Sequence, residues 1–201
     1  MAVAPASGTD LRKALRLEYF TIAWNVTEAV VAIGAGIAAG SIALIGFGFD
    51  SSIEGFAASV VIWQLRGVHD EDRERRALRL IAITFFVLAA YVVFESLRDL
   101  VTNAEPESSV IGIGVAVTSI IVMPTLGLAK KRLAQKMGSA VLRADAAETF
   151  LCSWLSVILL VGLVLNATVG WWWADPVAAL GIAWLALREG REAWSGGSDD
   201  D

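Results

Sequence analysis

The sequence predicts an all-α, polytopic membrane protein with six transmembrane helices and both termini in the cytoplasm. Hydrophobic residues make up 56% of the 201 residues, and charged residues make up 18%. Soluble domains carry more charge, about a quarter of their residues. The mean hydropathy is +0.63. The apolar residues also gather into blocks of about 20 residues, the length that crosses a hydrocarbon core of about 30 Å at 1.5 Å per residue.

The chain divides into three parts. We expect residues 1–18 to form a cytoplasmic N-terminal segment, in which a small, polar start leads into a surface helix over Leu11–Glu18. No short apolar core precedes a small-residue cleavage site, so the first span is expected to direct insertion. Residues 19–194 are predicted to form the six-helix transmembrane domain, and residues 195–201 a disordered tail.

The predicted spans follow from the apolar blocks and the turn residues between them. Pro124 is expected to kink the fourth span. Asp175 followed by Pro176 is typical of a helix start, with the acid as N-cap. The approximate bounds of the six spans are Tyr19–Ala39, Ile42–Leu65, Leu80–Leu100, Val110–Ala129, Asp145–Ala167 and Pro176–Trp194.

The positive charges predict the orientation. Every Lys and Arg except Arg98 falls on the side of the predicted bundle that holds both termini. The positive-inside rule places that side in the cytoplasm, which indicates a multi-pass protein of the cytoplasmic membrane. Trp171, Trp172 and Trp173 then lie at the outer interface, where an aromatic belt explains them. The net charge of −5 argues against a nucleic-acid partner, and a single cysteine excludes an intrachain disulfide.

Two acids in the second span point to a bound ligand. Asp50 and Glu54 stand four residues apart, on one helical face, in the otherwise apolar stretch GSIALIGFGFDSSIE. An acidic side chain at the centre of a membrane helix costs roughly 2.5–3.5 kcal/mol, so two on one face suggest that something binds there. A cation is the simplest candidate.

The fifth span repeats this spacing in the stretch ADAAETFLCS. Glu148 and Cys152 are again four residues apart, a separation of about 40° around a helix and about 6 Å along it. Two such pairs on facing helices supply four ligands, the number that suits a tetrahedral first-row metal.

These stretches resemble the second-helix and fifth-helix signatures of the cation diffusion facilitator transporters. In that family a Gly-Ser-Leu-Ala-Leu type run precedes two metal ligands at i and i+4, and the fifth helix carries Ala-Asp-Ala-x-His-x-x-x-Asp. The stretches YVVFESLRDL and WWWADPVAALGIAWLALREGREAW are also similar to the family, so the resemblance extends over residues 17–194. It implies that Asp50, Glu54, Glu148 and Cys152 are the metal ligands.

The chemistry of the expected site departs from the family pattern at two positions. Glu148 stands where the family has His, and Cys152 stands where it has Asp. Three carboxylates and one thiol leave zinc, manganese and ferrous iron all open as the metal. The family's usual cytoplasmic C-terminal domain is absent from this sequence, so the homodimer that the resemblance implies is expected to form through the transmembrane helices.

Several residues keep more than one interpretation. Cys152 suits either a ligand or a small packing residue, and Glu148 either a ligand or an interfacial acid. Glu28 and Glu95 line the transport path, partner buried basic or polar groups, or are protonated in place. His69, with Asp70 and Asp72, resembles in location a loop-borne second metal site of the family, but the family's His-rich loop pattern is missing, which favours a solvated run of charges.

The expected function is secondary transport of a divalent metal cation out of the cell, by alternating access and in exchange for protons. Gly46, Gly48 and the Pro124 kink are expected to assist the rearrangement. No prosthetic group is expected; the metal is the transported substrate. The alternative is a degenerate, non-transporting membrane protein that binds metal or assembles with another protein. An enzyme is not expected, because the sequence contains no Ser-His-Asp set, no HExxH motif and no phosphate-binding glycine loop.

Overall fold

The computed structural model describes residues 8–39, 42–67, 71–102, 110–169 and 174–195, and six helices account for nearly all of them. The predicted all-α class is confirmed, since the described residues include no strand. The helices are α1 (Gly8–Ala39), α2 (Ile42–Leu65), α3 (Glu71–Thr102), α4 (Val110–Met137), α5 (Ala140–Val169) and α6 (Ala174–Trp194).

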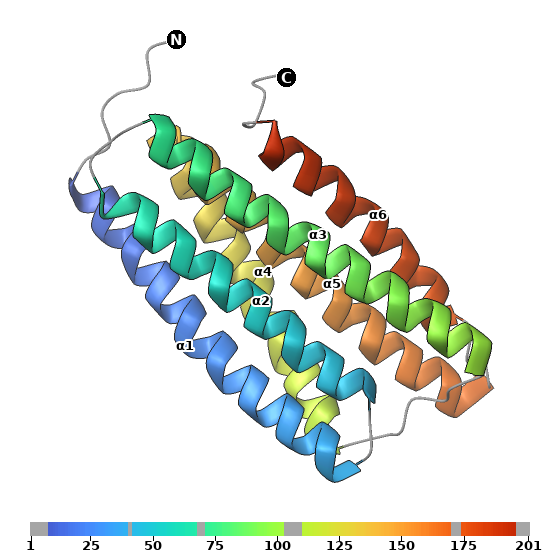
Figure 1. Cartoon of the computed structure of the whole chain (residues 1–201). Helices are drawn as coiled ribbons and strands as arrows, with labels where there is room; N and C mark the ends of the chain where they lie inside the picture. The colour runs from blue at the N-terminus through green and yellow to red at the C-terminus, as the bar shows by residue number, and fades with distance from the viewer. Residues whose placement is uncertain (1–7, 40–41, 68–70, 103–109, 170–173, 196–201) are drawn as a thin grey trace.

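Successive helices run in opposite directions along one bundle (Figure 1). Helices α1, α2, α5 and α4 form a closed ring, because each contacts the next and α4 contacts α1. The α3–α6 pair packs against this ring through α2 and α5. We call the end at which α1 begins and α6 finishes the proximal end, and the opposite end the distal end.

Five of the described helices are long and apolar enough to cross a membrane. Helix α6 is shorter and ends in a charged stretch that contains Arg188, Glu189, Arg191 and Glu192, yet it lies along the length of α3 (Figure 1). Large apolar side chains such as Val30, Phe94 and Val110 are exposed on the outside of the bundle. Soluble proteins rarely expose so much apolar surface, whereas lipid accommodates it.

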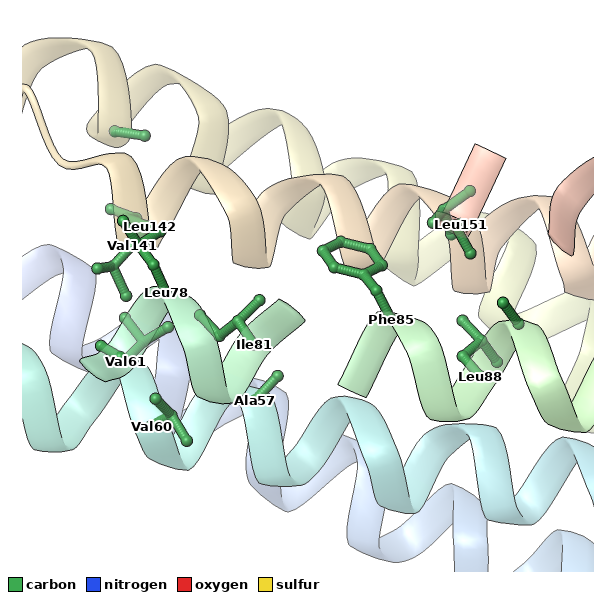
Figure 2. Close-up of a cluster of buried hydrophobic side chains, with 14 of the residues drawn as sticks. Ala57, Val60, Val61, Leu78, Ile81, Phe85, Leu88, Val141, Leu142 and Leu151 are labelled. Carbon is green, nitrogen blue, oxygen red and sulfur yellow. The ribbon is translucent and has the colours of Figure 1, made fainter. Parts of the chain in front are cut away.

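The largest apolar core lies where α3 packs against α2 and α5. Ile81, Phe85 and Leu88 follow one another along the inner face of α3 at helical spacing, and each is at most 1% exposed. Val61 of α2 and Leu142 of α5 belong to the same cluster, as Figure 2 shows. This core fixes α3 against the two helices that carry the candidate site.

The helices extend beyond the predicted spans at the proximal end. Helix α1 begins at Gly8 and continues without a break, so Leu11–Glu18 is helical as expected but is part of the first long helix. Glu18 is buried rather than on a surface helix. Lys130 likewise lies inside α4 and is fully buried, although the predicted fourth span ends one residue before it, at Ala129.

Some predictions fall on residues that the structure does not describe. His69, Asp70 and Trp171–Trp173 lie outside the described residues, as does the tail beyond Ser195. The roles expected of them stay predictions, as does the orientation of the bundle in the membrane. Pro124 lies inside the continuous helix α4, and its kink also stays a prediction.

Gly48 sets the close approach of α2 to α1. A Cβ at this position would lie 2.5 Å from Ile33 Cγ1 and 3.1 Å from the backbone oxygen of Ala29, which cannot move without shifting the helix. We therefore expect Gly48→Ala to lower the free energy of unfolding by about 1–3 kcal/mol, as overpacking does elsewhere. Thermal unfolding in detergent measures the change. Gly34→Ala on α1 is the control, because a Cβ at this position would meet nothing within 4 Å. This substitution should leave the stability unchanged or slightly raise it. Equal losses of stability in the two variants would contradict the close contact at Gly48.

Candidate metal centre

Four buried residues on α2 and α5 make up the candidate site. Asp50 and Glu54 of α2 are 4% and 1% exposed, and Glu148 and Cys152 of α5 are 2% and 1% exposed. Their spacing of four residues puts each pair on one face of its helix, and α2 contacts α5 directly. The structure thus places all four predicted ligands inside the bundle, away from the lipid-facing surface.

The antiparallel direction of α2 and α5 arranges these side chains in two layers. Asp50 and Cys152 lie on the distal side, within range of a hydrogen bond from the thiol to the carboxylate. Glu54 lies one turn closer to the proximal end and also neighbours Cys152 and Thr149. Glu148 interacts electrostatically with Glu54 and Asp50, while Thr84 of α3 lies beside its carboxylate.

The carboxylates of this site are poorly satisfied. Asp50 Oδ2 and both carboxylate oxygens of Glu54 and of Glu148 are buried without a hydrogen-bond partner. A buried charge without a partner is costly, so such groups carry a proton or neutralise a cation. Within the described parts of the chain, no three His, Cys, Asp or Glu side chains stand close enough together to hold a metal ion in this conformation. A bound ion would therefore require some of these side chains to move closer together.

Glu28 of α1 adds a fourth acid to this region. It is 3% exposed, and its Oε2 accepts a hydrogen bond of 2.9 Å from the hydroxyl of Ser51. Ser51 is the residue that follows Asp50 in α2. Its other oxygen, Oε1, has no hydrogen-bond partner. Glu28 also lies near enough to Asp50 and Glu54 for electrostatic repulsion between the carboxylates. The structure therefore places Glu28 beside the candidate ligands, where it also has a polar partner in Ser51.

A cavity of about 100 Å³ connects Asp50 to the distal half of the bundle. Its walls include Tyr91 and Glu95 of α3, and Asp99 lies farther along the same helix. Arg98 pairs with both acids, at 3.0 Å from Glu95 Oε2 and 2.8 Å from Asp99 Oδ1. Glu95 therefore lines this cavity and partners a basic group at the same time.

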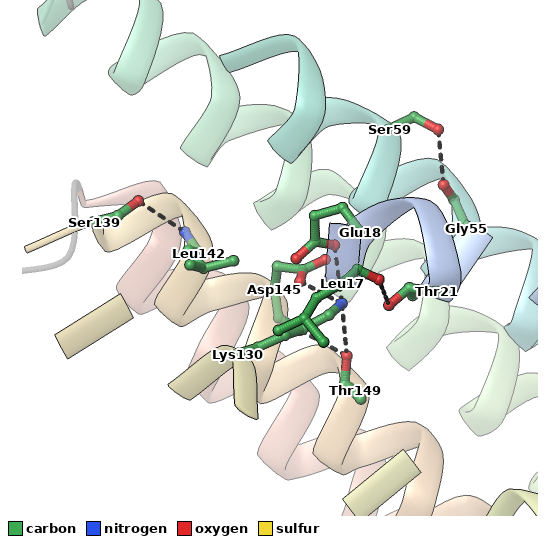
Figure 3. Close-up of polar contacts among 10 residues, drawn as sticks. All are labelled: Leu17, Glu18, Thr21, Gly55, Ser59, Lys130, Ser139, Leu142, Asp145 and Thr149. Atoms are coloured by element: carbon green, nitrogen blue, oxygen red, sulfur yellow. Dashed lines mark hydrogen bonds and ion pairs between the residues drawn. The ribbon is translucent and has the colours of Figure 1, made fainter. Parts of the chain in front are cut away.

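On the proximal side of the site lies a buried ionic cluster, formed by Glu18, Lys130, Asp145 and Thr149 (Figure 3). Lys130 Nζ donates to Asp145 Oδ2 at 2.6 Å and to Thr149 Oγ1 at 3.2 Å, and it lies 3.1 Å from Glu18 Oε2. The Lys130, Glu18 and Asp145 side chains are 0% exposed. Asp145 precedes Glu148 by about one helical turn, so the cluster adjoins the candidate site.

The sequence carried a signal for this cluster in its periodicity. Leu126, Lys130, Leu133 and Ala134 are buried on one face of α4, at the spacing of a helix face that points into a bundle. On α1 the buried positions Ala14, Glu18, Thr21, Asn25 and Glu28 follow the same spacing. Hydropathy alone does not reveal the cluster, because Glu18 and Lys130 each fall one residue outside a predicted span.

Fold and site together define a multi-pass helical membrane protein with acids and a thiol buried between facing helices. Residues 79–198, more than half of the chain, match the model of the cation efflux transmembrane domain. The chain belongs to the cation efflux family. The matched range contains Glu148 and Cys152 but begins after Asp50 and Glu54.

Two relatives illustrate the similarity. The chain is 25% identical over 168 residues to the uncharacterized transporter sll1263 of Synechocystis, which covers 79% of this chain and 54% of that protein. It is 31% identical over 108 residues to the cation-efflux pump FieF of Shewanella oneidensis, covering 53% of this chain and 36% of the pump. The chain thus spans about half the length of the first relative and about a third of the second.

Proposed function

We propose that the chain is a secondary transporter that exports a divalent transition-metal cation across the cytoplasmic membrane in exchange for protons. The observation that carries this proposal is the burial of Asp50, Glu54 and Glu148 between α2 and α5 with carboxylate oxygens that lack partners. Membership of the cation efflux family and the similarity to a cation-efflux pump support it.

Proton exchange follows from the chemistry of buried carboxylates. In the empty site, protons neutralise charges that would otherwise repel one another in a medium of low dielectric. Carboxylate and thiol ligands bind a metal in their deprotonated form, so the metal displaces these protons. Each cycle then carries metal one way and protons the other.

The chemistry of the candidate ligands limits the class of metal. Carboxylate oxygens favour harder ions such as manganese, whereas the Cys152 thiolate favours softer ones such as zinc. Zinc, manganese and ferrous iron are therefore the proposed substrates. The metal is cargo, and no prosthetic group or catalytic step is proposed.

Alternating access and dimerisation complete the proposal. The site lies between α2 and α5, and α3 packs against both helices, so a rearrangement of the ring relative to α3 and α6 would expose the site to each side in turn. The proximal end, with nearly all described Lys and Arg residues, would face the cytoplasm. The homodimer would form through the lipid-facing surface of the helices.

Purified protein in liposomes with a trapped pH dye tests the function. With zinc or manganese chloride added outside, we expect metal uptake together with a rise in the luminal pH, and faster uptake when the lumen starts acidic. Metal binding without uptake would instead support the non-transporting alternative. Uptake that proceeds without any pH change would contradict proton exchange, and the absence of both binding and uptake would overturn the proposal.

Cys152→Ser tests the thiol as a ligand. Because a hydroxyl is a harder and weaker donor than a thiolate, we expect zinc affinity to fall by at least about tenfold and manganese affinity to fall much less. Isothermal titration of the purified protein with each metal measures both. Ser156→Ala is the matched control: its hydroxyl donates to the backbone oxygen of Cys152 at 3.0 Å, one turn farther along α5. If zinc and manganese respond alike to Cys152→Ser, the thiol is a packing residue.

A further inference from the structure

The buried ionic cluster of Glu18, Lys130, Asp145 and Thr149 ties three helices together at one level of the bundle. The Lys130 ammonium on α4 reaches Glu18 on α1 and both Asp145 and Thr149 on α5 (Figure 3). The shortest of these contacts, 2.6 Å to Asp145 Oδ2, lies between α4 and α5. The 3.1 Å contact to Glu18 is the one that joins α1 to this pair.

Stability alone does not explain the cluster. Buried ion pairs seldom stabilise a fold more than apolar side chains of the same size would. Here two carboxylates face one ammonium, and Glu18 Oε1 and Asp145 Oδ1 have no hydrogen-bond partner. Such a cluster can favour one arrangement of the helices. Its contacts can also break when the helices move, because neither carboxylate is fully satisfied by them.

The two sides of the candidate site differ in the described structure. Toward the distal end, the cavity next to Asp50 reaches Glu95 and the beginning of α6. Toward the proximal end, the ionic cluster comes first, and the buried side chains of Ala14, Leu133 and Leu142 lie in the same proximal part of the bundle. A cation that enters from the proximal end through the ring of α1, α2, α4 and α5 reaches the level of Lys130 before it reaches Glu54 or Glu148.

We propose that Lys130 is a positioning residue that closes the proximal access to the site by holding Glu18 and Asp145 together. When the proximal side opens, the contact between Lys130 and Glu18 breaks and α1 separates from α4. This role rests on the proposed transport function, but the barrier itself is a property of the resting protein.

The single cysteine of the chain offers a direct probe of the barrier. Cys152 lies within the site, so its rate of reaction with the membrane-impermeant cationic reagent MTSET reports access from whichever side the reagent is added. Oriented membrane vesicles present one side at a time, and protease access to a tag fused to the C-terminus identifies the proximal side. No other thiol needs to be removed first.

Glu18→Gln is the test variant. It keeps the length of the side chain and leaves Lys130 balanced by Asp145, so the fold should survive while the charged link between α1 and α4 is lost. We expect MTSET added from the proximal side to modify Cys152 about tenfold faster than in the unaltered protein, with the distal rate unchanged. Glu18→Asp, which keeps the charge on a shorter arm, should give an intermediate proximal rate. Arg16→Gln is the control, since it removes a charge from the exposed face of α1.

The outcomes separate a barrier from a merely structural role. Equal acceleration from both sides in Glu18→Gln would mean general loosening and would overturn the proposal. An unchanged proximal rate, or the same increase in Arg16→Gln, would also overturn it. These labelling rates need no metal, so a proximal increase in a protein that moves no metal would uphold the barrier and reject the transport function.

Discussion

Lys130→Met is expected to lower the free energy of unfolding by about 3–5 kcal/mol, the cost of leaving buried charges without their partner. Methionine fills a similar volume, so packing changes little. The loss comes from Glu18 and Asp145, which then face each other inside the bundle with no cation between them. Both are fully buried, so water cannot take the place of the ammonium.

Denaturant titration of the detergent-solubilised protein, followed by circular dichroism, measures this loss. Lys131→Met is the matched control, because the neighbouring side chain is exposed and its replacement should change stability by no more than about 0.5 kcal/mol. A further variant with Glu18→Gln, Lys130→Met and Asp145→Asn together removes all three charges. It should recover most of the stability, since an uncharged cluster needs no counter-ion. Equal stability of Lys130→Met and Lys131→Met would show that the cluster is not charged as described.

Asp50→Asn is expected to abolish metal transport, with a loss of about a hundredfold or more in uptake rate. The amide keeps the shape of the side chain but removes the negative charge that would neutralise the ion. Asp50 is also the candidate ligand that lines the distal cavity, so its charge would act both in binding and at the point of release.

Uptake of zinc and manganese into proteoliposomes measures the effect, with the unfolding temperature as a check on the fold. Ser52→Ala is the control on the same helix, since Ser52 is exposed and its hydroxyl bonds only to the backbone oxygen of Gly48 among the contacts described. We expect that variant to transport normally. Full transport by Asp50→Asn would show that the Asp50 carboxylate is not a required ligand.

The helices and the polar faces of α2 and α5 follow from local patterns that a sequence displays. Blocks of apolar residues of membrane-spanning length gave the six helices, and the spacing of four residues put Asp50 with Glu54 and Glu148 with Cys152 on inner faces. Both inferences need only the geometry of a single helix. The burial of all four side chains agrees with them.

The partners of individual charges depend on how helices far apart in sequence pack together. Lys130 follows an apolar span and begins a run of basic residues, which is typical of a solvated charge. Its burial becomes evident only from the packing of α1 and α5 against α4. The sequence alone does not decide the role of Glu28 for the same reason, because Ser51 reaches it only where α1 and α2 pack closely, near Gly48. The packing of the α3–α6 pair outside the ring also had no local signal.

The central claim is that the side chains of α2 and α5 converge on a single ion inside the membrane domain. A structure of the protein with bound zinc or manganese, in which anomalous scattering locates the metal, tests it most directly. We predict one strong peak between the two helices, with Asp50, Glu54 and at least one of Glu148 and Cys152 at about 2.0–2.3 Å from the ion. A peak elsewhere, or a site whose ligands come from α2 or α5 alone, would contradict the account.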